Sequence, residues 1–173
     1  MSEALAARRS TAGLSPAAAA RLIALLLPLA LLGGALGSQY LGGLHPCEMC
    51  YWQRWPHAAA LLLAAVAFTA PAESSRSRVL TLVAALAIAT SGAIGVYHAG
   101  VEAKIFEGFT QCTATDKGLT GADLLKQITQ APLVRCDEVQ FRFLGISLAG
   151  WNALLSLGGA ALILILSLRG KRT

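Results

Sequence analysis

Four long apolar segments constrain this chain more than any other feature of its sequence. They cover residues 20–41, 47–70, 79–97 and 146–168, each boundary being approximate. A transmembrane helix needs about 20 mainly apolar residues. Charged residues make up only 13% of the chain, about half of their share in a soluble domain. The sequence therefore predicts an all-α integral membrane protein, a single domain built as a bundle of four transmembrane helices.

The first apolar segment has a second interpretation. Arg8, Arg9 and Arg21 surround its start and resemble the basic region of a cleaved signal peptide. The apolar stretch is longer than the roughly 7–15 residues usual in such a peptide. We therefore favour a retained helix.

Charge predicts the orientation of the bundle. In a four-helix topology, both chain ends and the turn between the second and third helices share one side. That side is rich in basic residues, namely Arg8, Arg9, Arg21, Arg76, Arg78, Arg169, Lys171 and Arg172. Basic residues near membrane helices stay in the cytoplasm. We expect both termini there, and a long loop at about 98–145 on the outer side.

The four cysteines all fall on the predicted outer side. Cys47 and Cys50 lie at the turn between the first two apolar segments, and Cys112 and Cys136 lie in the long loop. Disulfides persist in compartments outside the cytoplasm. The pattern therefore indicates disulfide chemistry.

The stretch HPCEMCYWQR, residues 45–54, combines a Cys-x-x-Cys pair with an arginine. Pro46 suits a helix start, because its missing N–H would have no helical partner there. We expect Cys47 and Cys50 in the first turn, where the helix dipole favours a thiolate. Arg54 would lie one turn from Cys50 on the same face. The pattern favours a redox pair over a structural disulfide or half of a metal site.

Cys112 and Cys136 allow more than one interpretation. A structural disulfide between them would stabilise the fold by about 3 kcal/mol. A zinc site of all four thiols is disfavoured, because this second pair lacks the short spacing of structural zinc sites. Between the two cysteines, residues 121–134 predict a short amphipathic helix at the membrane surface.

Two further features are predicted within the membrane. His98 ends the third apolar segment, and with Arg54 it could bind the polar part of a lipid-soluble molecule, since intramembrane ionisable residues are functional candidates. Gly33-x-x-x-Gly37 and the series Ala87, Ser91 and Gly95 predict close helix packing.

Three motifs resemble one known family. PCEMCYWQR, YHAGVE and VRCDEVQFRFLGISLAGWN resemble DsbB, the disulfide bond formation protein B family of the bacterial inner membrane. The resemblance covers roughly residues 20–168, including the four cysteines and the order of the apolar segments. It implies a thiol:quinone oxidoreductase that reoxidises a periplasmic thioredoxin-fold partner, DsbA, and reduces ubiquinone or menaquinone.

The resemblance also implies residue roles. Cys47 and Cys50 match the pair beside the quinone, and Cys112 and Cys136 match the loop pair that meets the partner. Arg54 and His98 match residues near the quinone. Gln53 stands where some members have Glu, so we assign that position no acid–base role.

Two rival functions remain open at this point. A vitamin K epoxide reductase-type enzyme also uses a Cys-x-x-Cys at a helix end with a quinone, although its motif order fits less well. A non-catalytic four-helix scaffold with a structural loop disulfide, or a metal-binding module, would account for the same composition. Exchangeable thiols without zinc would favour the enzyme.

Overall fold

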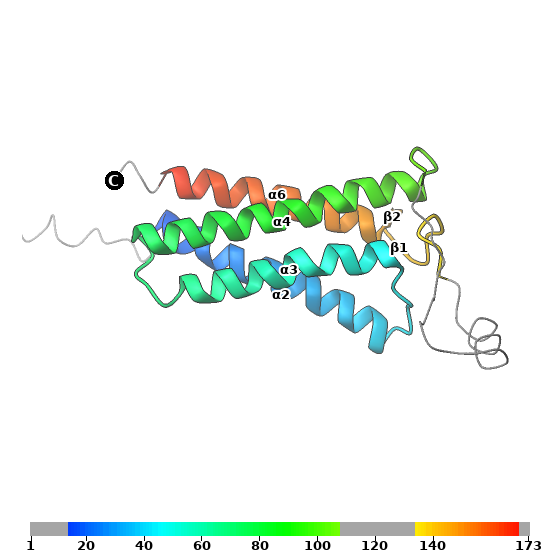
Figure 1. Cartoon of the computed structure of the whole chain (residues 1–173), viewed down its shortest axis with the longest axis horizontal. Coiled ribbons are helices and arrows are strands. Elements are labelled where there is room, and N and C mark those ends of the chain that lie inside the picture. The colour runs from blue at the N-terminus through cyan, green and yellow to red at the C-terminus, as the bar shows by residue number, and fades with distance from the viewer. Residues whose placement is uncertain (1–13, 108–133, 170–173) are drawn as a thin grey trace, which may run out of the picture.

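The computed structural model describes residues 14–107 and 134–169. Its helices are α2 (Pro16–Tyr40), α3 (Glu48–Ala67), α4 (Ser75–Glu102) and α6 (Leu148–Arg169). They lie side by side along the long axis of the molecule (Figure 1). A two-stranded hairpin of β1 (Arg142–Phe143) and β2 (Ile146–Ser147) precedes α6. The described part is therefore all-helical apart from this short hairpin.

Local sequence explains where the helices begin. Ser15 and Ser74 are the N-caps of α2 and α4, and each hydroxyl accepts a backbone N–H three residues later. Pro16 then occupies the first turn of α2, a position where proline costs no hydrogen bond. Cys47 is the N-cap of α3, and its sulfur accepts the N–H of Cys50 at 3.4 Å. The helix thus begins one residue after Cys47, not at Pro46 as expected.

Three of the four helices are long and apolar enough to cross a membrane, namely α2, α4 and α6. The sequence predicted four such helices. The exception is α3, whose first half carries Gln53, Arg54 and His57 among its apolar residues.

The helices pack through small residues. The central cluster consists mainly of alanines with two isoleucines, namely Ala20, Ala24, Ala60, Ala64, Ala84, Ala85, Ile88 and Ile163. The backbones of α4 and α6 lie close together: a Cβ on Gly95 would lie 3.0 Å from the carbonyl oxygen of Ala149. A Cβ on Gly33 or Gly37 would meet nothing within 4 Å. The predicted close packing is therefore present at Gly95 and wrong at Gly33 and Gly37.

The region expected as a loop at 98–145 is partly regular. α4 continues to Glu102, so His98 lies inside the helix, one turn before its end. Leu144 and Gly145 have positive φ values of 50° and 81°, as a two-residue hairpin turn requires. Trp151 donates from Nε1 to the carbonyl of Phe143 at 2.9 Å and holds the hairpin on α6. The helix expected at 121–134 lies outside the described residues, apart from Val134.

Candidate redox site

Three cysteines meet at one end of the bundle. The sulfur atoms of Cys47 and Cys50 lie 3.0 Å apart. Cys136 arrives from the segment before the hairpin, and its sulfur lies within 4.8 Å of the sulfur of Cys47. All three are free thiols, and Cys47 and Cys136 are each only 4% exposed. Cys112 lies outside the described residues.

His98 completes the group around Cys47. Its Nε2 lies 3.6 Å from the Cys47 sulfur and 3.8 Å from Oε1 of Glu102. Its Nδ1 lies 2.8 Å from Nε2 of Gln53. The imidazole is therefore buried between a thiol and an amide.

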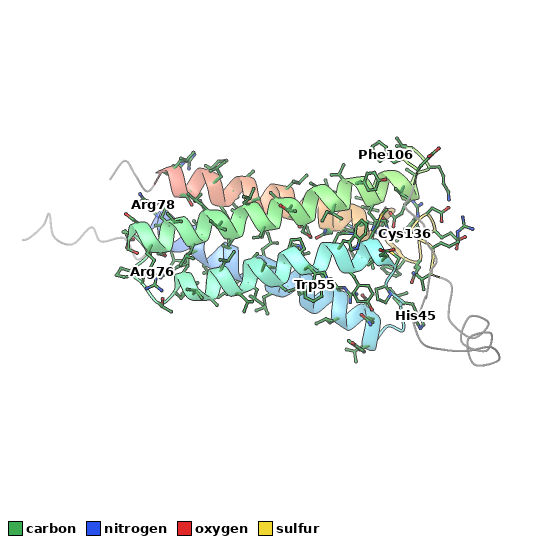
Figure 2. The ribbon with its side chains drawn as sticks, viewed as in Figure 1. His45, Trp55, Arg76, Arg78, Phe106 and Cys136 are labelled. Atoms are coloured by element: carbon green, nitrogen blue, oxygen red, sulfur yellow. The ribbon has the colours of Figure 1, made fainter. Side chains whose placement is uncertain are left out.

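Charged and polar contacts hold the segment that carries Cys136. Asp137 accepts from Lys104 at 2.6 Å and from Arg135 at 2.8 and 2.9 Å. Gln140 donates to the carbonyl of His45 at 2.6 Å. Figure 2 shows Cys136, His45 and Phe106 at one end of the bundle. These contacts join the segment to the end of α4 and to the turn before α3.

These two cations also determine the charge state of Asp137. The hydrogen bonds from Arg135 and Lys104 hold the pKa of its carboxyl well below its usual range. Asp137 therefore stays ionised at every physiological pH. Near the thiols, its carboxylate therefore remains paired with Arg135 and Lys104.

Arg54 reaches across to α2. It donates from Nη1 to Oε1 of Gln39 at 2.6 Å and from Nη2 to the carbonyl of Ala35 at 3.2 Å. Its guanidinium carbon lies 5.2 Å from the centre of the Tyr51 ring. Because Cys50 and Arg54 are four residues apart on one helix, the permanent positive charge lies on the face of that thiol.

A cavity of about 280 Å³ opens beside these residues. One wall comes from α2 and is mainly apolar, with Ala30, Leu31, Gly34 and Ala35. Other residues that line the cavity carry the functional groups, namely Cys47, Cys50, Gln53, Arg54 and His98. Four of these five residues were predicted from the sequence, and Gln53 is their neighbour. Together they line a space that would fit an apolar molecule with a polar head.

Sequence reasoning missed a buried polar network behind the cysteines. Gln53 Oε1 accepts from Nδ2 of Asn152 at 2.7 Å, and Asn152 Oδ1 lies 2.9 Å from Nε2 of His57. Ser91 donates to the carbonyl of Gln53 at 2.8 Å. The signal was present, since Gln53 and His57 are polar residues in an apolar segment. No pattern, however, paired them with Asn152, 99 residues further along the chain.

The group Cys47, His98 and Cys136 also has the ligand types of a metal site. Its two sulfurs and one ring nitrogen lie within 4.8 Å of one another, and all three residues are buried. Thiolate and imidazole are the ligands zinc prefers.

Fold and site together define a class of protein. A helical bundle with three membrane-capable helices, which gathers thiols and a histidine at one end, has the features of a membrane thiol–disulfide oxidoreductase. The family described as "Disulfide bond formation protein DsbB" matches residues 17–166. The chain belongs to the DsbB family, whose members are membrane oxidoreductases of disulfide bond formation.

Individual relatives agree with this assignment. A Disulfide bond formation protein B from a Polaromonas species is 31% identical over 83% of this chain and 86% of its own length. A second one, from Aromatoleum aromaticum, is 31% identical over 82% and 86%. A Disulfide bond formation protein B 1 from Pseudomonas fluorescens is 34% identical over 73% and 75%. No solved structure matches the chain.

Proposed function

We propose that this protein reoxidises a periplasmic thioredoxin-fold disulfide donor of the DsbA type and passes the electrons to a membrane quinone. The carrying observation is the position of Cys47, whose sulfur lies within 4.8 Å of that of Cys136 and 3.0 Å from that of Cys50. Cys50 in turn lines the cavity with Arg54. One thiol pair thus contacts both a loop-borne thiol and a space suited to a lipid-soluble molecule.

The exchange runs through two disulfides. A thiolate of the reduced partner attacks Cys112, and a second partner thiol resolves the mixed disulfide, so that Cys112 and Cys136 become reduced. The Cys136 thiolate then attacks the sulfur of Cys47. The Cys47–Cys136 bond forms, the Cys47–Cys50 bond breaks, and the bonding electrons leave on Cys50.

The cavity residues fit a quinone. The apolar residues of α2 suit a ring and an isoprenoid tail, and Arg54 and His98 offer polar groups in the same cavity. A bound quinone accepts two electrons and two protons. The Cys112 thiolate attacks Cys136, so that the Cys112–Cys136 disulfide re-forms and Cys47 leaves as a thiolate. Arg54 stabilises the Cys50 thiolate at the cavity wall, and re-formation of the Cys47–Cys50 disulfide from the two thiols would deliver two electrons to the quinone.

We also propose that all four helices span the bacterial inner membrane, with both termini in the cytoplasm. Arg76 and Arg78 lie at the end of the bundle opposite Cys136 (Figure 2), as the positive-inside rule expects for a periplasmic cysteine site. α3 can span because Gln53 and His57 are buried inside the bundle, and because Arg54 donates to Gln39 and to the carbonyl of Ala35 on α2. A polar group within the bundle interior does not face lipid.

Quinone reduction by the purified protein tests the proposal directly. With a reduced thioredoxin-fold partner and either ubiquinone or menaquinone, the native protein should turn over continuously. Cys50→Ser should abolish net turnover, because no thiol pair remains at the cavity. A native protein that oxidises the partner no more than twice per molecule, once for each of its two disulfides, with either quinone, would overturn the proposal.

The contact between Cys47 and Cys136 has its own test. In a Cys50→Ser, Cys112→Ser double variant, mild oxidation should join the two remaining cysteines within one molecule, so that alkylation labels neither. In the matched Cys47→Ser, Cys112→Ser variant, Cys50 and Cys136 should join far more slowly. Equal rates in the two variants would contradict the exchange order proposed above.

A further inference from the structure

Two backbone carbonyls fix the orientation of the buried amides behind Cys47. Gln53 donates from Nε2 to the carbonyl of Met49 at 3.2 Å. Asn152 donates from Nδ2 to the carbonyl of Ser91 at 3.2 Å and to Oε1 of Gln53 at 2.7 Å. A carbonyl oxygen can only accept. Each amide must therefore present its nitrogen to its carbonyl, which leaves Gln53 Oε1 as the acceptor facing Asn152.

This orientation determines the tautomer of His98. The nitrogen of Gln53 that donates to Met49 also lies 2.8 Å from Nδ1 of His98. Nδ1 must therefore accept, and a neutral His98 carries its proton on Nε2. That second nitrogen faces the sulfur of Cys47 at 3.6 Å. The imidazole thus presents an N–H to Cys47.

We propose that Gln53 is a positioning residue, which holds His98 as the Nε2–H tautomer so that the imidazole stabilises Cys47 as a departing thiolate and resists metal binding. The inference rests on the exchange proposed above. When an incoming thiolate attacks Cys136 in the Cys47–Cys136 disulfide, a new disulfide forms at Cys136 and the bonding electrons leave on Cys47. A hydrogen bond to that sulfur favours its departure. The total number of disulfides is unchanged.

Other groups around His98 agree with a neutral ring that donates from Nε2. Glu102, one turn further on α4, lies 3.8 Å from Nε2, beyond hydrogen-bond distance, and it also interacts with Ser147 and Arg142 from the hairpin. The ring also forms a hydrogen bond with the backbone of Cys136. Cys50 and Arg54 lie further along, on the cavity wall. The Cys47 sulfur, at 3.6 Å, lies nearer to Nε2 than the Glu102 carboxylate does at 3.8 Å.

Distance alone does not separate this arrangement from a zinc site. With Zn–S of about 2.3 Å and Zn–N of about 2.0–2.1 Å, tetrahedral ligands would lie about 3.6 Å apart, as Cys47 and His98 do. A zinc-bound histidine, however, needs a bare ligating nitrogen and usually donates its other N–H to a carboxylate or carbonyl. Gln53 presents an N–H at that position. To accept instead, its amide would have to lose the bonds to Met49 and Asn152.

The first test reads the tautomer in the native full-length protein. The chain has only three histidines, so nitrogen NMR of ¹⁵N-histidine-labelled protein resolves each ring, and His98→Gln identifies the signals of His98. We expect a protonated Nε2 and a bare Nδ1. A proton on Nδ1 of His98 in the native protein would overturn the inference, whatever the quinone activity.

The second test changes only the group that faces Nδ1. Gln53→Glu replaces the donor with a carboxylate that accepts, so the proton should move to Nδ1 and zinc should bind the reduced protein at least about tenfold more tightly, as outer-shell changes commonly do. Gln53→Met keeps the length without either function and is the packing control. Equal zinc affinity in native and Gln53→Glu proteins would contradict the inference.

The third test follows the chemistry of Cys47. The Cys47–Cys136 disulfide is prepared and opened with a small thiol, and release of Cys47 is followed against pH. Gln53→Met should slow release about tenfold, while Gln53→Glu should restore the rate only at the lower pH values where its carboxylate keeps both ring nitrogens protonated, and should lose it at higher pH, where the remaining proton sits on Nδ1. Release with an unchanged rate and profile in both variants would refute the positioning role. Failure of native quinone reduction would instead refute the proposed function.

Discussion

The two ends of the bundle use arginine in similar contacts for different purposes. At the end that carries the basic residues, Arg21 donates to the carbonyls of Ala67 and Ala70 at 3.5 and 2.8 Å. Its guanidinium carbon lies 4.2 Å from the centre of the Phe68 ring. These contacts give hydrogen-bond donors to carbonyls at and just after the end of α3, where a cation is favourable.

At the cysteine end, Arg54 makes nearly the same contacts. It donates to the carbonyl of Ala35 and to Gln39, beside the ring of Tyr51. The difference is what lies next to it, namely a cavity and the Cys50 thiol. Contacts with carbonyls and aromatic rings are therefore typical of any arginine that joins helices. The neighbouring thiol and cavity are the features that indicate a role for Arg54 in the redox reaction.

The largest predicted effect separates these two arginines. Arg54→Ala should lower quinone reduction at least tenfold, because a charge-assisted contact is worth about 1.5–3 kcal/mol, while exchange between the partner and Cys112/Cys136 stays largely intact. Arg21→Ala should lower thermal stability and leave the rate per folded molecule unchanged. Both variants are measured for quinone reduction and for thermal unfolding in the same detergent.

Arg54→Lys serves as the control for charge. Lysine keeps the positive charge but lacks the planar fork that contacts Gln39 and Ala35 together. We expect an intermediate rate of quinone reduction. If Arg21→Ala and Arg54→Ala were equally impaired in rate, the distinction between the two ends would be lost.

A second prediction compares two glycines at the cysteine half of the bundle. Gly95→Ala should destabilise the protein by about 1–3 kcal/mol, the usual cost of overpacking, because its Cβ would lie 3.0 Å from both Ala149 O and Ala153 N. Gly33→Ala should be neutral or stabilising by about 0.5–1 kcal/mol, since its Cβ meets nothing. Thermal unfolding in detergent measures both. A larger loss in Gly33→Ala would mean that its face is packed.

Sequence alone predicted the helices and much of the site, for physical reasons that also explain the errors. Apolar length predicts a helix wherever lipid or core surrounds it, so four helices were found. The motif that contains Cys47, Cys50 and Arg54 is local, and its helix geometry follows from spacing. Helix ends depend on single capping residues, which an apolar pattern does not reveal. The start of α3 therefore differs from the expected one, with Cys47 as the N-cap.

Long-range pairs were beyond the reach of sequence pattern. Gly33-x-x-x-Gly37 has the spacing of a packing motif, but spacing does not say whether a helix lies opposite. Sequence reasoning assigns Gln53 no acid–base role, because an amide neither takes up nor releases a proton in the physiological range. Its contacts with His98 and Asn152 give it a role through hydrogen-bond direction, which no residue type reveals.

The smallest predicted effect concerns two acids, one at each end. At the basic end, a hydrogen bond donated by Ser15 lowers the pKa of Glu73. At the cysteine end, Arg135 and Lys104 lower the pKa of Asp137. Both carboxyls are more acidic in the folded protein, so the stability they contribute is complete above the unfolded pKa of about 4. It is lost only as the pH falls through the lower, folded pKa.

Only Asp137 should affect the thiols, because it holds the segment of Cys136. We measure the rate of Cys47–Cys136 disulfide formation per thiolate in the Cys50→Ser, Cys112→Ser variant. Above about pH 4 this rate should not change through Asp137, because its carboxyl is already fully ionised there. Adding Asp137→Asn should slow that rate severalfold at neutral pH, and high salt should reduce the difference, because exposed ion pairs are screened. Glu73→Gln should leave it unchanged at either salt concentration. Glu73 lies at the far end of the bundle from the thiols. Equal slowing by the two substitutions would therefore mean that they act through the stability of the whole protein and not through the segment of Cys136.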